Sequence, residues 1–82
     1  MPIYFFIWDD DDNVPHLVEH DVTPEEAAYV VERATDDDRT VSRSTGLPVA
    51  FGRTSTGRRL AVVYRFLDDA KIEVYVATAY DV

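Results

Sequence analysis

Three strand-like runs separated by short turns fill most of the second half of this chain, and they constrain its fold more than any other feature. They cover residues 49–54, 59–66 and 71–80, and apolar side chains recur at every second position within the last two. The intervening segments, 55–57 and 68–69, hold the Ser, Thr, Gly and Asp residues that favour tight turns. Strands joined by such short loops run in opposite directions, so the sequence predicts an antiparallel sheet.

The same alternation predicts which side chains lie inside. One face of the last two runs is almost wholly apolar, and we expect it to pack against helices. Its members are Leu60, Val62, Tyr64, Phe66, Ile72, Val74 and Val76, with Thr78 and Tyr80 in the same phase. Arg65 and Tyr75 then point out from the opposite, uncovered face. A further strand is predicted over residues 39–45, before a turn that begins at Gly46.

The chain begins with a short apolar run. Residues 3–8 are β-branched or aromatic throughout, which indicates a strand buried on both faces. The acidic segment 9–13 ends this strand, and a short helix is predicted over residues 14–20. The run is far shorter than the ~20 apolar residues that span a bilayer, and no basic flank precedes it. We therefore expect no membrane segment and no signal peptide, and a cytoplasmic location.

The clearest local signal is a helix start. Thr23 suits the N-cap, Pro24 the first helical position, and Glu26 follows the cap by the spacing of a capping box. The predicted helix runs to about Ala34. The order of elements is then β-α-α-β-β-β-β, an α+β domain with a mostly antiparallel sheet and two helices on one face. With 82 residues, the chain is expected to form one domain over residues 1–82.

Charge is divided unevenly along the chain, whose net charge is −8. Residues 1–38 hold twelve of the sixteen acidic residues and one base, and so carry −11. Residues 39–82 carry +3, from seven bases and four acids. A basic surface in the second half could bind RNA locally although the whole protein repels it at long range. The alternative is that the two halves attract each other, or that the acids only solubilise the domain.

The residues available for metal binding are few. The chain has no cysteine, which excludes a disulfide framework, a thiolate zinc site and a cysteine nucleophile. His16 and His20 are spaced to share a helix face, and Glu19 or Asp21 could add a ligand. A second element with histidine ligands is missing, and we predict no metal site and no cofactor.

The arginines of the second half suggest a phosphate-binding surface. The guanidinium group suits bidentate contact with phosphate, and tyrosines on neighbouring strands could stack on bases. The arginines are Arg43, Arg53, Arg58, Arg59 and Arg65, and the tyrosines are Tyr64, Tyr75 and Tyr80. A sheet with several arginines, a tyrosine and a nearby histidine could cleave RNA without metal. The alternative is that these arginines are ordinary solvent-exposed strand residues.

An ordered set of motifs resembles the BrnT-like toxins. The opening of that family is similar to Trp8-Asp9, Asn13, His16 and the segment 20–27 of this chain. Its glycine-arginine hairpin and valine-rich strand are similar to residues 51–58 and 60–65, and its last strand to residues 76–79. The resemblance implies a RelE-like fold and a ribonuclease of a type II toxin–antitoxin pair, with a dimeric DNA-binding antitoxin as partner.

The resemblance also suggests which residues act. Together with the residue-based reading, it gives His20, Arg53, Arg65 and Tyr80 as candidate catalytic residues and Arg43, Arg58 and Tyr75 as candidate RNA contacts. Two other functions stay open. The chain could be a non-catalytic member of the same fold that binds a partner protein, or a domain that self-associates through the edges of its sheet.

Overall fold

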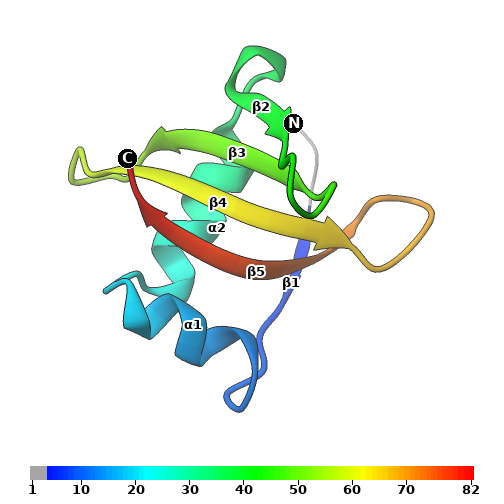
Figure 1. Ribbon diagram of the computed structural model, residues 1–82, viewed down its shortest axis with the longest axis horizontal. Coiled ribbons are helices and arrows are strands. Elements are labelled where there is room, and N and C mark those ends of the chain that lie inside the picture. The colour runs from blue at the N-terminus through cyan, green and yellow to red at the C-terminus, as the bar shows by residue number, and fades with distance from the viewer. Residues whose placement is uncertain (1–3) are drawn as a thin grey trace.

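The computed structural model describes residues 4–82 as a five-stranded sheet packed against two helices (Figure 1). In chain order the elements are β1 (Phe5–Ile7), α1 (Asn13–Glu19), α2 (Pro24–Arg33), the 3-10 turn η1 (Asp36–Asp38), β2 (Arg39–Val41), β3 (Pro48–Arg53), β4 (Arg59–Phe66) and β5 (Glu73–Asp81). The predicted α+β class and the predicted order of helices and strands are therefore confirmed.

The sheet has the strand order β1-β5-β4-β3-β2. Every neighbouring pair is antiparallel except β1 and β5, which run parallel. This places β1 at an edge, where the predicted burial on both faces is wrong, because Phe5 is 65% exposed. Phe6 and Trp8 pack inward with their rings stacked at 5.9 Å. Ile3, which the prediction included in this strand, lies outside the described residues.

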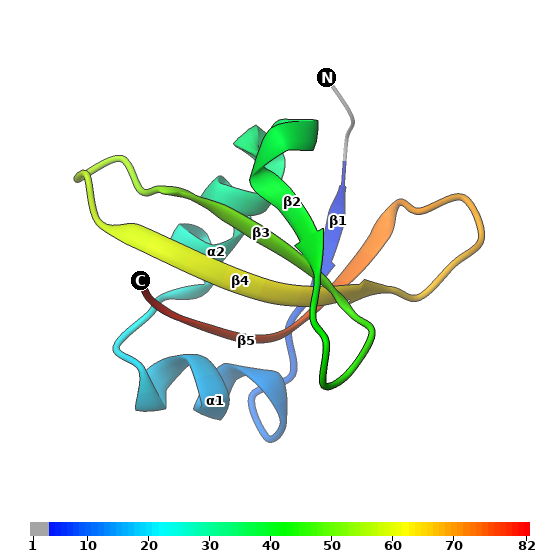
Figure 2. The same cartoon turned by 45° about the horizontal axis from the view of Figure 1, so that its top comes forward.

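Both helices lie on the same side of the sheet. Figure 2 shows α2 crossing behind β3 and β4, while α1 lies beside β5. The main core fills the space between helices and sheet. Its buried members are Leu17, Val22, Ala27, Val30, Val31, Ala50, Leu60, Val62, Tyr64, Val74, Val76 and Ala79. None of the helices described within residues 4–82 is long and apolar enough to cross a membrane.

A β-bulge in β5 changes the predicted facing of its last residues. Val63 pairs with Thr78 and Tyr64 pairs with Val76, which leaves Ala77 without a partner. The extra residue reverses the alternation, so Ala79 enters the main core in place of Thr78 and Tyr80. The inward prediction is confirmed for Leu60, Val62, Tyr64, Phe66, Val74 and Val76. It is wrong for Ile72, which precedes β5 and is exposed.

The helix start and the turns have local causes. The Thr23 hydroxyl oxygen accepts a hydrogen bond from the Glu26 amide at 3.1 Å, and the Glu26 carboxylate accepts one from the Thr23 amide at 3.0 Å. The predicted capping box is confirmed. The strand predicted over 39–45 ends earlier, at Val41, because Ser42 and Gly46 close a hydrogen-bonded turn in which Gly46 adopts a φ of +75°.

Arg39 joins the end of α2 to the sheet. Its guanidinium donates hydrogen bonds to the backbone oxygens of Val31 at 3.1 Å and Ala34 at 3.2 Å, and to the hydroxyl oxygen of Tyr64. Carbonyl groups at the C-terminus of a helix lack intrahelical partners and carry partial negative charge. Here the guanidinium of Arg39, the first residue of β2, donates hydrogen bonds to two of these carbonyl groups.

Candidate functional site

The sheet face that carries no helix is the candidate functional surface, and we refer to it as the open face. Its side chains come from alternate residues of β3, β4 and β5, as the strand pairing defines. They are Val49, Phe51, Arg53, Arg59, Ala61, Val63, Arg65, Glu73, Tyr75, Thr78 and Tyr80. Three of these residues are arginines and one, Glu73 at the start of β5, is acidic, although the protein as a whole carries a net charge of −8.

The centre of the open face is apolar. Val49, Ala61 and Val63 are buried there without a covering helix, and Leu47, Phe51 and Ala77 pack partly buried against them. Neighbouring side chains within the sheet therefore shield this centre from water. The arginines lie toward the two ends of the strands, and Glu73 shares the end that holds Arg65, so the face combines an apolar middle with charged ends.

One end carries two arginines side by side. Arg53 and Arg59 are directly paired across β3 and β4, and both are exposed. Like charges at paired positions destabilise a sheet. Arg53 donates a hydrogen bond to the Gly57 backbone oxygen at 3.0 Å, and within residues 4–82 neither arginine forms an ion pair. A bound anion would relieve the repulsion between the two guanidinium groups.

Tyr80 and His20 lie beside this pair. Tyr80 is paired with Ala61, the next residue of β4 on the open face after Arg59. Its side chain is exposed, and its ring centroid lies 6.2 Å from that of His20. His20 is the C-cap of α1, which brings an imidazole to the edge of the sheet. Arg53, Arg59, Tyr80 and His20 therefore form a row, which we call the basic end of the open face.

The other end of the open face holds Arg65 and Tyr75, a cross-strand pair of β4 and β5. The Arg65 guanidinium lies 5.0 Å from the centre of the Tyr75 ring. The Tyr75 hydroxyl donates a hydrogen bond to the carboxylate of Asp12, and this bond raises the pKa of Tyr75 to about 12. At about 3.4 Å per residue along a strand, the six steps between Arg59 and Arg65 separate them by roughly 20 Å.

The four residues predicted as catalytic therefore do not meet at one place. His20, Arg53 and Tyr80 belong to the basic end, whereas Arg65 stands at the opposite end of β4. Arg59 joins the basic end, although the sequence-based list of site residues omitted it. The signal was present in the sequence, because Arg59 and Arg65 are an even number of residues apart on one strand and so share a face.

Arg58, predicted as an RNA contact, lies on the helix side of the sheet. Its guanidinium binds the Asp81 carboxylate at 2.6 Å and the backbone oxygens of His20 and Asp21, and it lies 3.5 Å from the Glu26 carboxylate. The hydrogen bond to Asp81 raises the pKa of Arg58, and the same bond lowers that of Asp81. Arg58 thus ties the α1–α2 connection to β5.

The remaining predicted contact, Arg43, is exposed in the turn between β2 and β3. It stands outside the paired strands that form the open face. Metal ligands do not converge either, because no group of three His, Cys, Asp or Glu side chains with suitable geometry occurs within residues 4–82.

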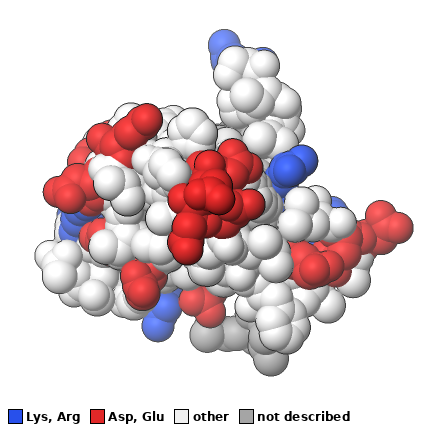
Figure 3. Space-filling model, turned by 90° about the horizontal axis from the view of Figure 1, so that it is seen from below, with Lys and Arg blue, Asp and Glu red and all other residues white. Residues whose placement is uncertain are grey.

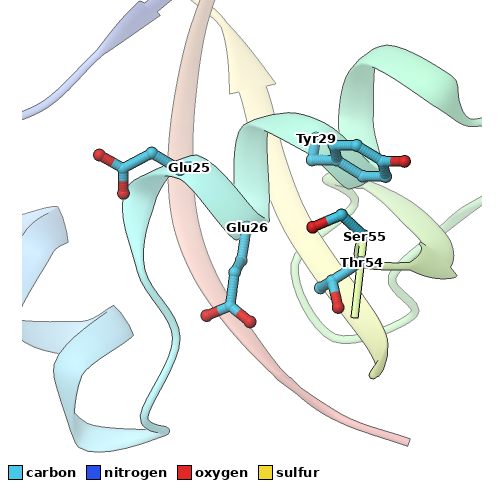
Figure 4. Close-up of a pocket in the computed structure, with 5 residues that line it drawn as sticks. All are labelled: Glu25, Glu26, Tyr29, Thr54 and Ser55. Carbon is cyan, nitrogen blue, oxygen red and sulfur yellow. The ribbon is translucent and has the colours of Figure 1, made fainter. Parts of the chain in front are cut away.

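A shallow hollow of about 130 Å³ lies between α2 and the β3–β4 hairpin, on the helix side (Figure 4). It is lined by Glu25, Glu26, Tyr29, Thr54 and Ser55. Two of its polar groups already have partners: Glu26 belongs to the capping box, and the Thr54 hydroxyl oxygen accepts a hydrogen bond from the Arg58 amide at 3.1 Å. The hollow lies where α2 packs against the β3–β4 hairpin, and it is separate from the open face.

Comparison with known proteins found no matching family model, no similar curated protein and no similar solved structure. The chemistry of the open face is therefore the basis for a functional argument.

Proposed function

We propose that this protein is a small RelE-like toxin of the cytoplasm, a metal-independent endoribonuclease that a cognate antitoxin neutralises. The observation that carries the proposal is the basic end of the open face. There, two paired arginines lie next to a tyrosine and a histidine, and the acidic strand residue of this face, Glu73, lies at the opposite end. The resemblance to BrnT-like toxins supports the same assignment.

RNA cleavage next to a 2′-hydroxyl requires three things: a base for that hydroxyl, positive charge for the phosphorane, and an acid for the leaving oxygen. In the proposed arrangement, Arg53 and Arg59 bind the phosphate. His20 and Tyr80 transfer the protons, and the ring of Tyr80 is free to stack on a base. Arg58 acts as a positioning residue, because it donates a hydrogen bond to the backbone oxygen of His20 at 2.9 Å.

The first test is inducible expression in one bacterial host, scored by growth and by the integrity of total RNA. The wild type should arrest growth and cleave RNA, and Arg53→Ala should restore growth because it removes a phosphate-binding charge. Arg33→Ala is the matched control, since Arg33 is an exposed arginine on α2, away from the open face. Normal growth with folded wild-type protein would contradict the ribonuclease proposal.

A second candidate function is favoured by the apolar centre of the open face. Val49, Ala61 and Val63, with Phe51 beside them, form an uncovered cluster that could dock a partner protein without any catalysis. The chain would then be a non-catalytic member of the same fold. In that case expression should leave growth unchanged. If the partner is a small protein encoded by a neighbouring gene, Phe51→Asp should abolish its capture by this protein, whereas Arg53→Ala should have little effect.

Self-association through the sheet edges is the third proposal. Both edge strands, β1 and β2, are only three residues long, and short edge strands limit edge-to-edge pairing. Sedimentation over a range of concentrations would detect it as a rising mean mass.

A further inference from the structure

The two ends of the open face differ in how their arginines are surrounded. At the basic end, Arg53 and Arg59 have only uncharged side chains beside them on the face. At the opposite end, Arg65 stands over Tyr75, whose hydroxyl holds the carboxylate of Asp12, and the exposed Glu73 lies on the same face two residues before Tyr75. An acidic residue from the first half of the chain therefore reaches one end of the open face and leaves the other end free.

The loop that carries Asp12 is held firmly. Asn13 is buried, and its amide nitrogen donates to the Ile7 backbone oxygen at 2.9 Å, while its amide oxygen accepts from the Asp9 backbone nitrogen at 2.7 Å. The Asp12 amide also donates to the Asp9 backbone oxygen at 3.2 Å. Figure 3 shows several acidic patches on the molecule seen from below, the side on which Figure 1 places α1. The position of Asp12 thus follows from the way β1 ends and α1 begins.

Asp12 lies close enough to Arg65 to weaken its attraction for an anion. The Tyr75 ring separates the two groups, with the guanidinium 5.0 Å from the ring centre and the carboxylate bonded to the ring hydroxyl. The charges are then no more than about 10 Å apart, which is the Debye length at 0.1 M salt. A phosphate that approaches Arg65 therefore meets the field of Asp12 as well.

We propose that Asp12, held by Tyr75, screens Arg65, confines polyanion binding to the basic end, and thereby limits the length of RNA that the open face binds. Asp12 then lowers the affinity of the open face for longer RNA strands. This inference rests on the proposed function, because it takes single-stranded RNA as the polyanion.

The test measures fluorescence anisotropy of labelled tetrauridylate and decauridylate over a range of salt concentrations. At low salt, Asp12→Asn should tighten decauridylate binding by up to about twofold, the effect of one charge about 10 Å away in water, and leave tetrauridylate binding nearly unchanged. The slope of log affinity against log salt should steepen by about 0.7 for the decamer, as one more phosphate is neutralised. Tyr75→Phe should act in the same direction, because it releases Asp12.

Two controls separate this effect from a general change of charge. Asp10→Asn removes the same charge from the same loop, and Asp10 is exposed and makes no side-chain hydrogen bond among the described residues. It should tighten binding less than Asp12→Asn does. In an Arg65→Gln background, Asp12→Asn should have no more effect than Asp10→Asn.

The outcomes distinguish the two proposals. Equal effects of Asp12→Asn and Asp10→Asn, or a gain that persists without Arg65, would overturn the screening role while leaving RNA binding intact. Binding by Asp12→Asn alone, with none by the wild type, would support screening and contradict RNA binding by the natural protein. Binding by neither would overturn both.

Discussion

Arg39 brings a positive charge to the helix side of the sheet with no carboxylate partner among residues 4–82. Its partners are backbone oxygens at the end of α2 and the hydroxyl of Tyr64. Burial raises the pKa of Tyr64, and the nearby guanidinium of Arg39 offsets part of this rise. At the residue scale, polar groups such as this one determine how helix and sheet are joined. Removing the arginine would leave several acceptors without donors.

We expect Arg39→Met to lower the free energy of unfolding by about 2–3 kcal/mol, the penalty for leaving buried polar groups unpaired. Urea denaturation followed by circular dichroism measures it. Arg43→Met is the control, because Arg43 is exposed in a turn and surface changes of this kind stay within about 0.5 kcal/mol. Equal losses in the two variants would refute a joining role for Arg39.

Tyr75 should show its contact with Asp12 in an alkaline titration. The hydrogen bond to Asp12 favours the neutral phenol and raises the pKa of Tyr75 to about 12, above the ordinary value of about 10. The contribution to stability is therefore fully present below pH 10 and is lost as the pH rises toward 12. Ultraviolet titration should find one late-ionising tyrosine that is absent in Tyr75→Phe. In Asp12→Asn its pKa should return toward 10, and an unchanged value would show that Asp12 is not the partner.

At the scale of elements, β4 is the centre of the sheet and separates two different surroundings. Val62 faces the helices and is 0% exposed, whereas Arg65 stands on the open face and is exposed. The same strand therefore contributes to the main core and to the candidate site. Substitutions at neighbouring positions should separate stability from function.

Val62→Asp should prevent stable folding, because it buries an unpaired charge at a cost of about 3–5 kcal/mol. Arg65→Ala should leave the melting temperature nearly unchanged, since it removes an exposed side chain. Thermal melts of the two variants check both expectations. A Val62→Asp protein that melts like the wild type would mean that the assignment of the inner face is wrong.

The bulge in β5 makes a further prediction about this element. Deleting Ala77, the unpaired residue, would leave every other cross-strand pair in register and should give a folded protein. Deleting Val63 instead should unfold it, because a slip of one residue turns the following side chains to the wrong face. Circular dichroism of the two deletion variants compares them directly. Loss of structure in both would show that the bulge is required for closure of the core.

The elements that could be predicted are those whose causes are local. The capping box at Thr23, the hairpin turn at Gly57 and the alternation of 59–66 each depend on residues close together in the sequence. The bulge at Ala77 could not be predicted, because it reflects how two strands meet. The edge position of β1 depends on a strand at the other end of the sequence.

In the candidate site, too, the features with local causes could be predicted and those that depend on distant contacts could not. Alternation along the strands placed Arg65 and Tyr75 on the open face correctly. The separation of Arg65 from Arg53 depends on the register between strands. The contacts of Arg58 and Asp12 join residues distant in sequence, and no local pattern encodes them.

At the scale of the whole molecule, opposite charges are little used to join the two halves of the chain. Both ion pairs within residues 4–82 involve Arg58, and only the one with Glu26 links the acidic first half to the second. The excess of acidic residues therefore repels itself in the folded state, and attraction between the halves contributes little. Net charge of this size opposes compactness unless salt screens it.

We expect added sodium chloride to raise the melting temperature by a few degrees, because screening removes more repulsion than attraction. Melting in dilute buffer and at physiological ionic strength tests this. Potassium glutamate in place of the chloride salt controls for specific ion binding. A falling melting temperature would instead indicate that attraction between the halves is the larger effect.

The parallel pairing of β1 with β5 has a consequence for how the protein is made. β1 leaves the ribosome before the other four strands of this sheet, and its only neighbour in the described sheet is β5, the last of them. Until β5 has been translated, the strand that carries Phe6 has no partner strand, and the core against which Phe6 and Trp8 pack lacks Ala79. The domain therefore cannot complete its sheet before β5 has emerged, and fragments that lack β5 are expected to present aromatic surface to chaperones and proteases.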